Sequence, residues 1–444
     1  MHKFIFTLTS ILIAATSFTQ EVKSFTIEDA KVYALENHLI VKNANNDIEI
    51  ARKKIIETRG LGFPQVNING NFNHFINLPI TVLDAKFLNP MAADGETISF
   101  EAGTKYNSSG SIEVGQILFD GSYIVGLQVA SFFTEFQETL SNQSKEDVVF
   151  SVIQTYGLVA IAKENKSFMD SLVATTTELV KQQQHLLELG LILQEDMDQF
   201  SYSLIDAKNA QLNASLQYEN TLNMLKLAMG YPIKGLINVS NSTNDLMTKE
   251  ALKTGDIKSN ITFMILEGQV KLSELNVKNN KLSNLPSLNA FFSQAYNAFR
   301  GEFNFFTDER WYPQTVWGLQ LNIPVFSGLS RHARTSQSKI KLLSDQNSLV
   351  LMEQNLQFQE IQSQNNYKAT LSKTALQSQN MALAKTIYSN ALIRVNIGKV
   401  NSINVTQKHT QYMTAQAQYI GSLVELFQAK LVLDKLYNNI LPNQ

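Results

Sequence analysis

The chain has 444 residues, no cysteine, and 37 basic against 39 acidic residues, which gives a formal net charge of −2. The absence of cysteine excludes disulfides, thiol catalysis, cysteine-ligated zinc and acylation on a lipoprotein cysteine, and the lack of a basic excess argues against nucleic acid as a partner. The 41 asparagine and 33 glutamine residues nearly equal all charged residues, while glycine and proline are scarce, which indicates long helices with uncharged polar faces.

The first 19 residues have the pattern of a secretory signal peptide. His2 and Lys3 form a short polar start, residues 4–15 form an apolar stretch, and small residues near 15–19 offer cleavage positions. A membrane-anchoring helix is the alternative, but the stretch is too short to span a bilayer comfortably. No later run of 18 or more apolar residues occurs, so we expect no transmembrane helix.

After this segment, the same series of elements is expected twice. A helix comes first, then a strand pair, a very long helix, a break at a glycine and another helix. Sixty-odd helical residues at about 1.5 Å each make a rod on the order of 100 Å, for which a globular domain has no use. The expected elements are helix 27–60, strands within 64–119 and helices 122–187 and 195–229, and then helix 257–284, strands within 286–326 and helices 329–395 and 402–440.

Sequence landmarks recur in the same order in the two halves, which predicts an internal two-fold repeat. Residues 112–121 align with 319–328, and Leu189-Gly190-Leu191 matches Ile397-Gly398-Lys399. Asn37 precedes Pro64, and Asn260 precedes Pro286, by nearly the same interval. The predicted divisions are a signal peptide at 1–19, a first repeat at 20–230, a linker at 231–256 and a second repeat at 257–444.

The last helix carries a seven-residue repeat, which favours coiled-coil packing over an ordinary amphipathic helix. Mostly small residues follow three positions later, which allows close helix approach. The equivalent seam in the first half has one polar interruption, at Gln211. The seam residues are Val405, Tyr412, Tyr419, Leu426, Leu433 and Ile440 in the second half, and Met197, Leu204, Gln211, Tyr218 and Leu225 in the first.

The predicted strands have unlike faces. Asn67, Asn69, Asn71 and Asn73 alternate with apolar residues, and residues 317–325 repeat this alternation. A soluble sandwich gives the same alternation. Two details favour a membrane barrel with a water-filled interior: the polar face is rich in amides, and aromatic residues crowd the strand ends. Four strands cannot close a barrel, so this interpretation requires association with copies of the same chain.

The order and motifs of the chain resemble the TolC family of outer-membrane efflux channels over residues 25–440. The matching motifs are 25–30 with 34–37, Pro64 opening a strand, 116–121 and 227–232. The resemblance implies a mostly α fold in which a long α-helical coiled-coil barrel is continuous with a transmembrane β-barrel of four strands per chain. It also implies a homotrimer in the outer membrane of a Gram-negative bacterium, extending into the periplasm, with 231–256 as an equatorial linker.

The function implied by the resemblance is that of a passive exit duct in a tripartite efflux or secretion system. Its partners would be outer-membrane lipid, a periplasmic adaptor protein and, through the adaptor, an inner-membrane pump. The alternative is a secreted or periplasmic coiled-coil scaffold without channel activity. The sequence contains no phosphate loop, no GxGxxG, no HExxH and only scattered histidines, so we expect no enzyme, no cofactor and no metal site.

The two glycine breaks are expected to form the periplasmic tips of helical hairpins, which open to let cargo pass. Apolar side chains beside them would dock the adaptor, since exposed apolar groups are costly without a partner. These are Leu189, Gly190 and Leu191 at the first tip, and Ile397, Gly398 and Val400 at the second. A plain turn with a C-cap glycine is the alternative interpretation.

The family resemblance also places a pore constriction just past each glycine. Asp196 matches an acidic family position after the first glycine, although it could also be an ordinary acid at a helix N-terminus. After the second glycine, Asn404 and Gln407 stand where well-known members carry aspartates. Amides attract cations less than carboxylates do, so a less cation-selective entrance is expected.

Overall fold

The computed structural model describes residues 22–248 and 255–441, so the predicted signal peptide lies outside the described residues. The chain forms two compact units, each built from segments of both sequence halves. The first takes residues up to 45, 140–264 and 352 onward, and the second takes 46–139 and 265–351. The division into two sequence halves joined by 231–256 remains a prediction about the repeat, because the compact units cut across it.

The first unit begins with a short strand and a capped helix. Helix α1 (Ile27–Asn37) starts at Thr26, whose side chain and backbone exchange hydrogen bonds with Asp29 in a capping box. Strand β1 (Lys23–Phe25) pairs in parallel with β6 (Ile237–Val239), a pairing that the sequence patterns did not predict. The short helix α5 (Thr243–Thr248) follows β6 within the predicted linker.

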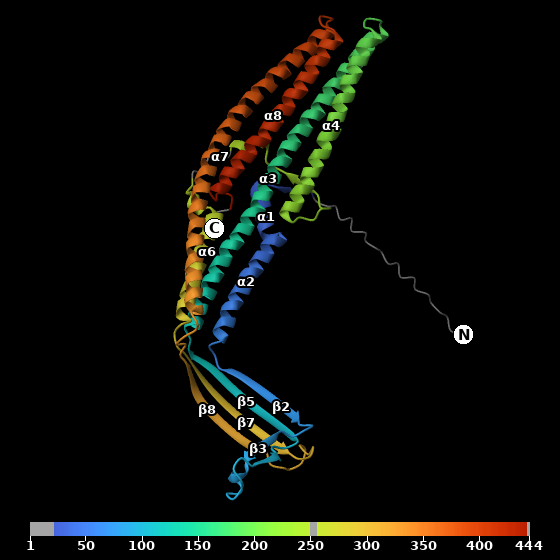
Figure 1. The fold of residues 1–444 in the computed structure, drawn as a ribbon. Coiled ribbons are helices and arrows are strands. Elements are labelled where there is room, and N and C mark those ends of the chain that lie inside the picture. Colours follow the sequence, from blue (N-terminus) through green and yellow to red (C-terminus); the bar gives the residue numbers. More distant parts are fainter. Residues whose placement is uncertain (1–21, 249–254, 442–444) are drawn as a thin grey trace, which may run out of the picture. The chain divides into compact units, whose positions relative to one another are not determined.

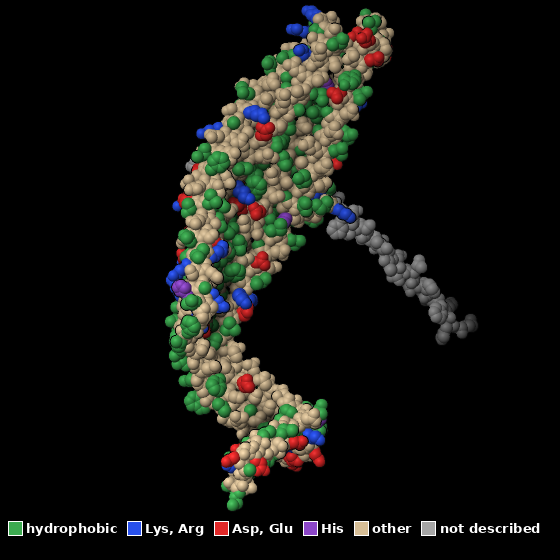
Figure 2. All heavy atoms as spheres, viewed as in Figure 1, with side chains coloured by type: hydrophobic (Ala, Val, Ile, Leu, Met, Phe, Trp, Pro, Cys, Tyr) green, Lys and Arg blue, Asp and Glu red, His purple; other side chains and the backbone are tan. Residues whose placement is uncertain are grey.

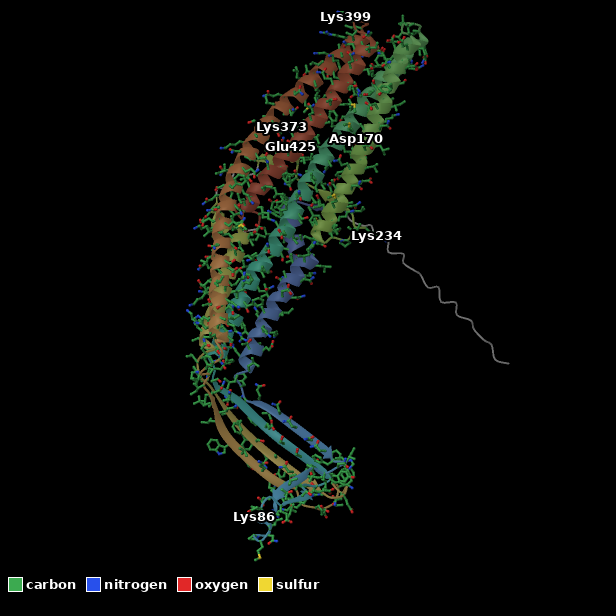
Figure 3. The ribbon with its side chains drawn as sticks, viewed as in Figure 1. Lys86, Asp170, Lys234, Lys373, Lys399 and Glu425 are labelled. Carbon is green, nitrogen blue, oxygen red and sulfur yellow. The ribbon has the colours of Figure 1, made fainter. Side chains whose placement is uncertain are left out.

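Helices α4 and α8, with the longer parts of α3 and α7, form two hairpins in this unit, where α3 lies beside α4 and α7 beside α8 (Figure 1). A hydrogen bond of 2.7 Å from Gln211 to Asp170 joins the first pair, and an ion pair of 2.6 Å between Lys373 and Glu425 joins the second (Figure 3). The predicted helix ends are confirmed to within a few residues. The bounds are α3 Gly121–Glu188, α4 Gln194–Met229, α7 Ser330–Asn396 and α8 Ser402–Leu436.

The predicted seven-residue seam of the last helix is buried. Burying an apolar seam is what holds helices together in such a bundle, because their exposed faces are polar. In the first half, the polar interruption Gln211 is half-buried and its hydrogen bond to Asp170 satisfies its amide. In the second half, Tyr419 is half-buried, and the buried seam residues are Val405, Tyr412, Leu426, Leu433 and Ile440.

The second unit holds a four-stranded antiparallel sheet with strand order β2-β5-β7-β8. The two strand pairs predicted from the two sequence halves are therefore joined side by side, through β5 and β7. Helix α2 (Leu39–Gly60) leads into β2, and α6 (Ile261–Leu282) leads into β7. The strands are β2 Gln65–His74, β5 Tyr106–Phe119, β7 Ser287–Arg300 and β8 Tyr312–Asn322.

The connection between β2 and β5 contains short elements that the sequence patterns did not predict. It contains β3 (Ile80–Asp84), a 3-10 turn η1 (Ala85–Phe87) and β4 (Thr97–Glu101). Strands β3 and β4 pair with each other in a separate two-stranded sheet. Strands of five residues are too short for a period-two alternation to mark them clearly in the sequence.

Three predicted helix boundaries are wrong in detail. The helix expected at 27–60 is two helices, because His38 is extended (φ −67°, ψ 130°) where the backbone of Gly230 approaches it closely. The helix expected at 257–284 starts as a 3-10 turn η2 (Ile257–Ser259), and extended Asn260 separates that turn from α6. Helix α8 ends at Leu436, so Ile440 packs its buried side chain from outside the helix.

No helix within the described ranges, 22–248 and 255–441, is long and apolar enough to cross a membrane. The same ranges contain no group of three or more histidine and acidic residues arranged to hold a metal ion.

Candidate functional site

The strand register sorts the side chains of the sheet onto two faces. Val66 lies opposite Val114, which lies opposite Phe292, which lies opposite Trp317. Directly opposed residues share a face, so this row of apolar side chains crosses all four strands. All four belong to one face, and Trp317 is 77% exposed. The chain covers this apolar face at one end, where Phe303 packs on Phe72, and leaves Trp317 exposed.

The other face of the sheet is rich in amides and hydroxyls. Asn69 lies opposite Ser111, and Ser111 leads through Ala295 to Gln314 on the far strand. The four predicted asparagines, Asn67, Asn69, Asn71 and Asn73, share this face and are exposed. Glu113 is the one acidic residue in the paired positions of this face. Their placement toward a lumen remains a prediction.

Both edges of the sheet lack a partner strand in the described part of the chain. β2 pairs with β5 alone, and β8 pairs with β7 alone. Each edge therefore carries a row of backbone donors and acceptors that are free to pair with another chain. A sheet with an uncovered apolar face and two open edges is incomplete as a single copy.

Aromatic side chains gather at the end of the sheet away from α2 and α6. The loop 301–311 folds onto the apolar face, where Phe303 packs edge-to-face on Phe72 and Tyr106. Arg300, only 4% exposed, holds this loop through Glu309 at 3.1 Å and through backbone carbonyl groups. The sequence singled out most of these aromatic residues, but it gave no sign of the anchoring role of Arg300.

The two hairpin tips have the same backbone geometry. Gly190 (φ +73°) and Gly398 (φ +69°) adopt the left-handed conformation that glycine tolerates best. Leu191 N–H donates to the carbonyl of Leu186, and Lys399 N–H donates to the carbonyl of Arg394, which closes the same C-capping motif in both tips. The predicted glycine breaks at these helix ends are confirmed.

Most of the predicted docking side chains are exposed at these tips. Leu189 is 71% exposed, Leu191 is 69% exposed and Ile397 is 60% exposed. Val400 differs from the expectation, because it is half-buried against the apolar core between the helices. Their contact with an adaptor remains a prediction.

The predicted constriction residues occupy the first turns after the breaks. Asp196 is half-buried, and its carboxylate accepts a hydrogen bond from the hydroxyl of Ser402 on the other hairpin. The backbone N–H of Asn404 donates to the side chain of Asn401, which caps α8. Gln407 is exposed. The structure brings Asp196 to the second tip, but it leaves the pore-lining role of all three untested.

Uncharged polar contacts join the two hairpins near their tips. The amide of Gln183 on α3 donates to Asn396 on α7 at 3.2 Å, and Asn396 donates to Gln182 at 3.1 Å. Ser203 on α4 donates to Thr406 on α8 at 3.2 Å. Sequence reasoning missed these contacts, because the partners lie more than 200 residues apart and the seven-residue pattern marks only apolar positions.

The tips differ in charge. Acidic side chains gather at the α3–α4 tip and basic ones at the α7–α8 tip, where Lys399 lies (Figures 2 and 3). The whole stretch 361–424 contains no aspartate or glutamate. The uncharged contacts near the tips leave these charges on the surface, where they shape recognition more than stability.

Comparison with known proteins identifies what this arrangement is similar to. Residues 265–439 match the model of the outer membrane efflux protein family. The resemblance to TolC-type efflux channels is confirmed. No match emerges from the comparison with curated proteins. The family match and the TolC-like fold support an outer-membrane location that extends into the periplasm.

Several solved outer-membrane channels share the TolC-like fold across almost the whole chain. CusC is 14% identical with a TM-score of 0.72, and the match covers 93% of this chain and 91% of CusC. The open state of MtrE from Neisseria gonorrhoeae is 14% identical with a TM-score of 0.71, covering 93% and 88%. CmeC from Campylobacter jejuni is 14% identical with a TM-score of 0.67, covering 93% and 85%. At this identity, the likeness shows the fold.

Proposed function

We propose that the protein is a passive outer-membrane exit duct made of three copies. The observation that carries this proposal is the four-stranded sheet, which has one apolar face, one amide-rich face and two open edges. Three such sheets, joined edge to edge, give twelve strands and leave no open edge in lipid, where every backbone group must be satisfied. The apolar face then contacts lipid, and the asparagine row, 67 to 73, lines the water-filled interior.

Transport through such a duct requires no covalent chemistry. The family whose model matches the chain consists of efflux proteins, which supports a role in export. The helical hairpins would guide cargo across the periplasm, and the uncharged contacts near the tips would have to break for the entrance to widen. Hydrogen bonds between neutral side chains contribute only about 1 kcal/mol each, so this opening is energetically accessible.

Exposed leucine and isoleucine side chains at the tips support the proposal that a periplasmic adaptor docks there. Replacing Leu191 and Ile397 with serine should abolish export while the assembly keeps its mass, because these side chains lie outside the core. Replacing the similarly exposed Leu216, on α4 well away from the tip, should leave export unchanged. Equal loss of export in both variants would contradict tip docking.

The mass of the detergent-extracted native particle, corrected for bound detergent, tests the trimer. Three chains per particle, released only by extracting the outer membrane, are expected. A monomer or dimer released without detergent would overturn the duct and favour a soluble coiled-coil scaffold. The cysteine-free sequence adds a second test, since cysteines placed on β2 and β8 should cross-link only between copies.

A further inference from the structure

A buried histidine lies among the helices of the two hairpins. His409, on α8, is 2% exposed, and its Nε2 has no hydrogen-bond partner among the described residues. The ring of Tyr388, on α7, meets it edge-to-face with 5.5 Å between ring centroids. The hydroxyl of Tyr388 is also buried, and Thr176 on α3 is its polar neighbour. A buried polar atom without a partner, such as His409 Nε2, is unusual in a native structure.

The surroundings of His409 suit the neutral imidazole and not the charged one. Burial lowers the pKa of His409, and Asp206 on α4 opposes this effect more weakly. Tyr388 faces it from α7, and burial raises the pKa of that hydroxyl, so it stays neutral. On α8 itself, Lys408 and Tyr412 are its titratable neighbours. An imidazolium needs acceptors for both N–H groups, and the described residues offer Nε2 none.

The position of His409 couples its charge to the packing of both hairpins. An apolar cluster of all four helices surrounds this level of the bundle: Leu172 and Leu179 from α3, Phe200 and Ala214 from α4, Val395 from α7 and Val405 from α8. A charge without partners costs several kcal/mol in such an interior unless water reaches it. Separation of the helices would admit water to it.

We propose that His409 is a pH-sensitive switch. Its protonation in acid loosens the contact between the two hairpins and widens the tips. This role of His409 rests on the proposed function, in which the tips open. The contacts involved all lie within one chain. A neutral His409 keeps the hairpins packed at neutral pH. Below its unfolded value of about 6.5, the widened form binds the proton better and gains population.

The test uses the absence of native cysteines. Spin labels on Leu191→Cys and Ile397→Cys report the distance between the two tips of a chain in the purified, detergent-extracted particle. Assembling a minority of labelled chains with unlabelled ones restricts the reading to one chain. Between pH 7.5 and 5, the population with widened tips should grow by up to about tenfold per pH unit, the limit for one coupled proton.

Two variants separate the proton from the packing. His409→Phe keeps an aromatic ring that cannot be protonated, and it should abolish the widening. Tyr388→Phe removes the buried hydroxyl beside His409 but leaves the imidazole, so it should keep the pH response. A pH response unchanged in His409→Phe, or no widening in the original chain, would overturn the proposal.

A third variant guards against misfolding of His409→Phe. His409→Leu should remove the widening as well, and thermal unfolding at pH 7.5 identifies which of the two variants keeps its fold. The particle mass is read separately. A particle of three chains without pH-dependent widening would contradict the proposed role of His409 alone. Widening in a particle that is not a trimer would contradict the exit duct and leave the role of His409 supported.

Discussion

Backbone conformation and burial set a few individual residues of this protein apart from their neighbours. The positive φ at the two tips requires glycine there. Gly421, by contrast, lies inside α8, where an added Cβ would meet no atom within 4 Å. Similarly, Glu146 differs from the other carboxylates because it is 4% exposed and one of its oxygens has no partner. Each of these differences leads to an experiment.

Alanine at a tip glycine and at Gly421 should have opposite effects. Gly190→Ala forces a Cβ into the left-handed region and should destabilise the helical body by about 1 kcal/mol. Gly421→Ala should stabilise it by roughly 0.5–1 kcal/mol, since alanine favours helix interiors. Denaturant unfolding followed by circular dichroism measures both. Changes of the same sign in the free energy of unfolding would contradict the different backbone conformations assigned to Gly190 and Gly421.

Replacing Glu146 should remove one component of the pH dependence of stability. Burial raises the pKa of Glu146 to about 7, despite Lys435 nearby. A raised folded pKa contributes stability that is complete below the unfolded value near 4.5 and is lost as pH rises through 7. Glu146→Gln should therefore match the original chain at pH 4.5 and exceed it at pH 8, by on the order of 2 kcal/mol.

Thermal unfolding between pH 4.5 and 8 measures this difference. Glu425→Gln is the matched control, because it removes a half-exposed carboxylate from an ion pair with Lys373. This control should leave the change in unfolding temperature between pH 4.5 and 8 the same as in the original chain. If the stability of Glu146→Gln changed with pH as steeply as that of the original chain, the buried carboxylate would not be the source of the pH dependence.

Helices in this chain approach each other closely at some glycines, and one such contact joins the two hairpins. Gly157 of α3 lies against the ring of Phe427 on α8, where a Cβ would stand only 2.1 Å from a ring carbon. Both belong to the first unit, and Phe427 is buried in its core. The repeat in sequence does not reveal this contact, because it joins the long helix of one half to the last helix of the other.

Gly157→Ala should destabilise the helical body by about 1–3 kcal/mol, because the added methyl group overpacks the contact. The double variant Gly157→Ala with Phe427→Leu should recover part of the loss, since the smaller side chain can yield. Chemical unfolding of Gly157→Ala, Phe427→Leu and the double variant gives the coupling free energy between the two residues. Additive losses would show that the two residues do not meet in solution.

At the scale of the whole molecule, the proposed duct would complete features that one copy leaves open. The sheet has two edges without a partner strand among the described residues, most of its apolar face is exposed, and the tips expose leucine and isoleucine. Assembly into a ring would place Asn404 and Gln407 around one entrance, while the carboxylate of Asp196 is already bonded to Ser402. In that arrangement, the α8 tip would contribute amides instead of carboxylates to the entrance, and we expect the permeation properties to reflect this.

The assembled channel should select only weakly between cations and anions. Asn404→Asp with Gln407→Asp adds two carboxylates per copy and should shift the reversal potential in a salt gradient toward cation selectivity, with stronger block by divalent ions. Gln418→Asp, farther along α8 from the tip, should have a smaller effect. Strong cation selectivity in the unmodified channel would contradict this prediction.

The sequence by itself determined the order and type of the main elements. Period-two and period-seven patterns and glycine breaks are local, so they predicted the four main strands, the four long helices and both tips within a few residues. They failed where a distant segment imposes the conformation, as Gly230 does at His38, and where a strand is very short, as with β3 and β4.

The tertiary structure decided how distant segments meet. It joined the two strand pairs through β5 and β7, paired β1 with β6, and connected Gln183 with Asn396 and Asp196 with Ser402. These contacts involve single polar side chains or strand edges far apart in the sequence. No periodicity marks them, because each is selected by three-dimensional proximity and by the need of a buried polar group for a partner.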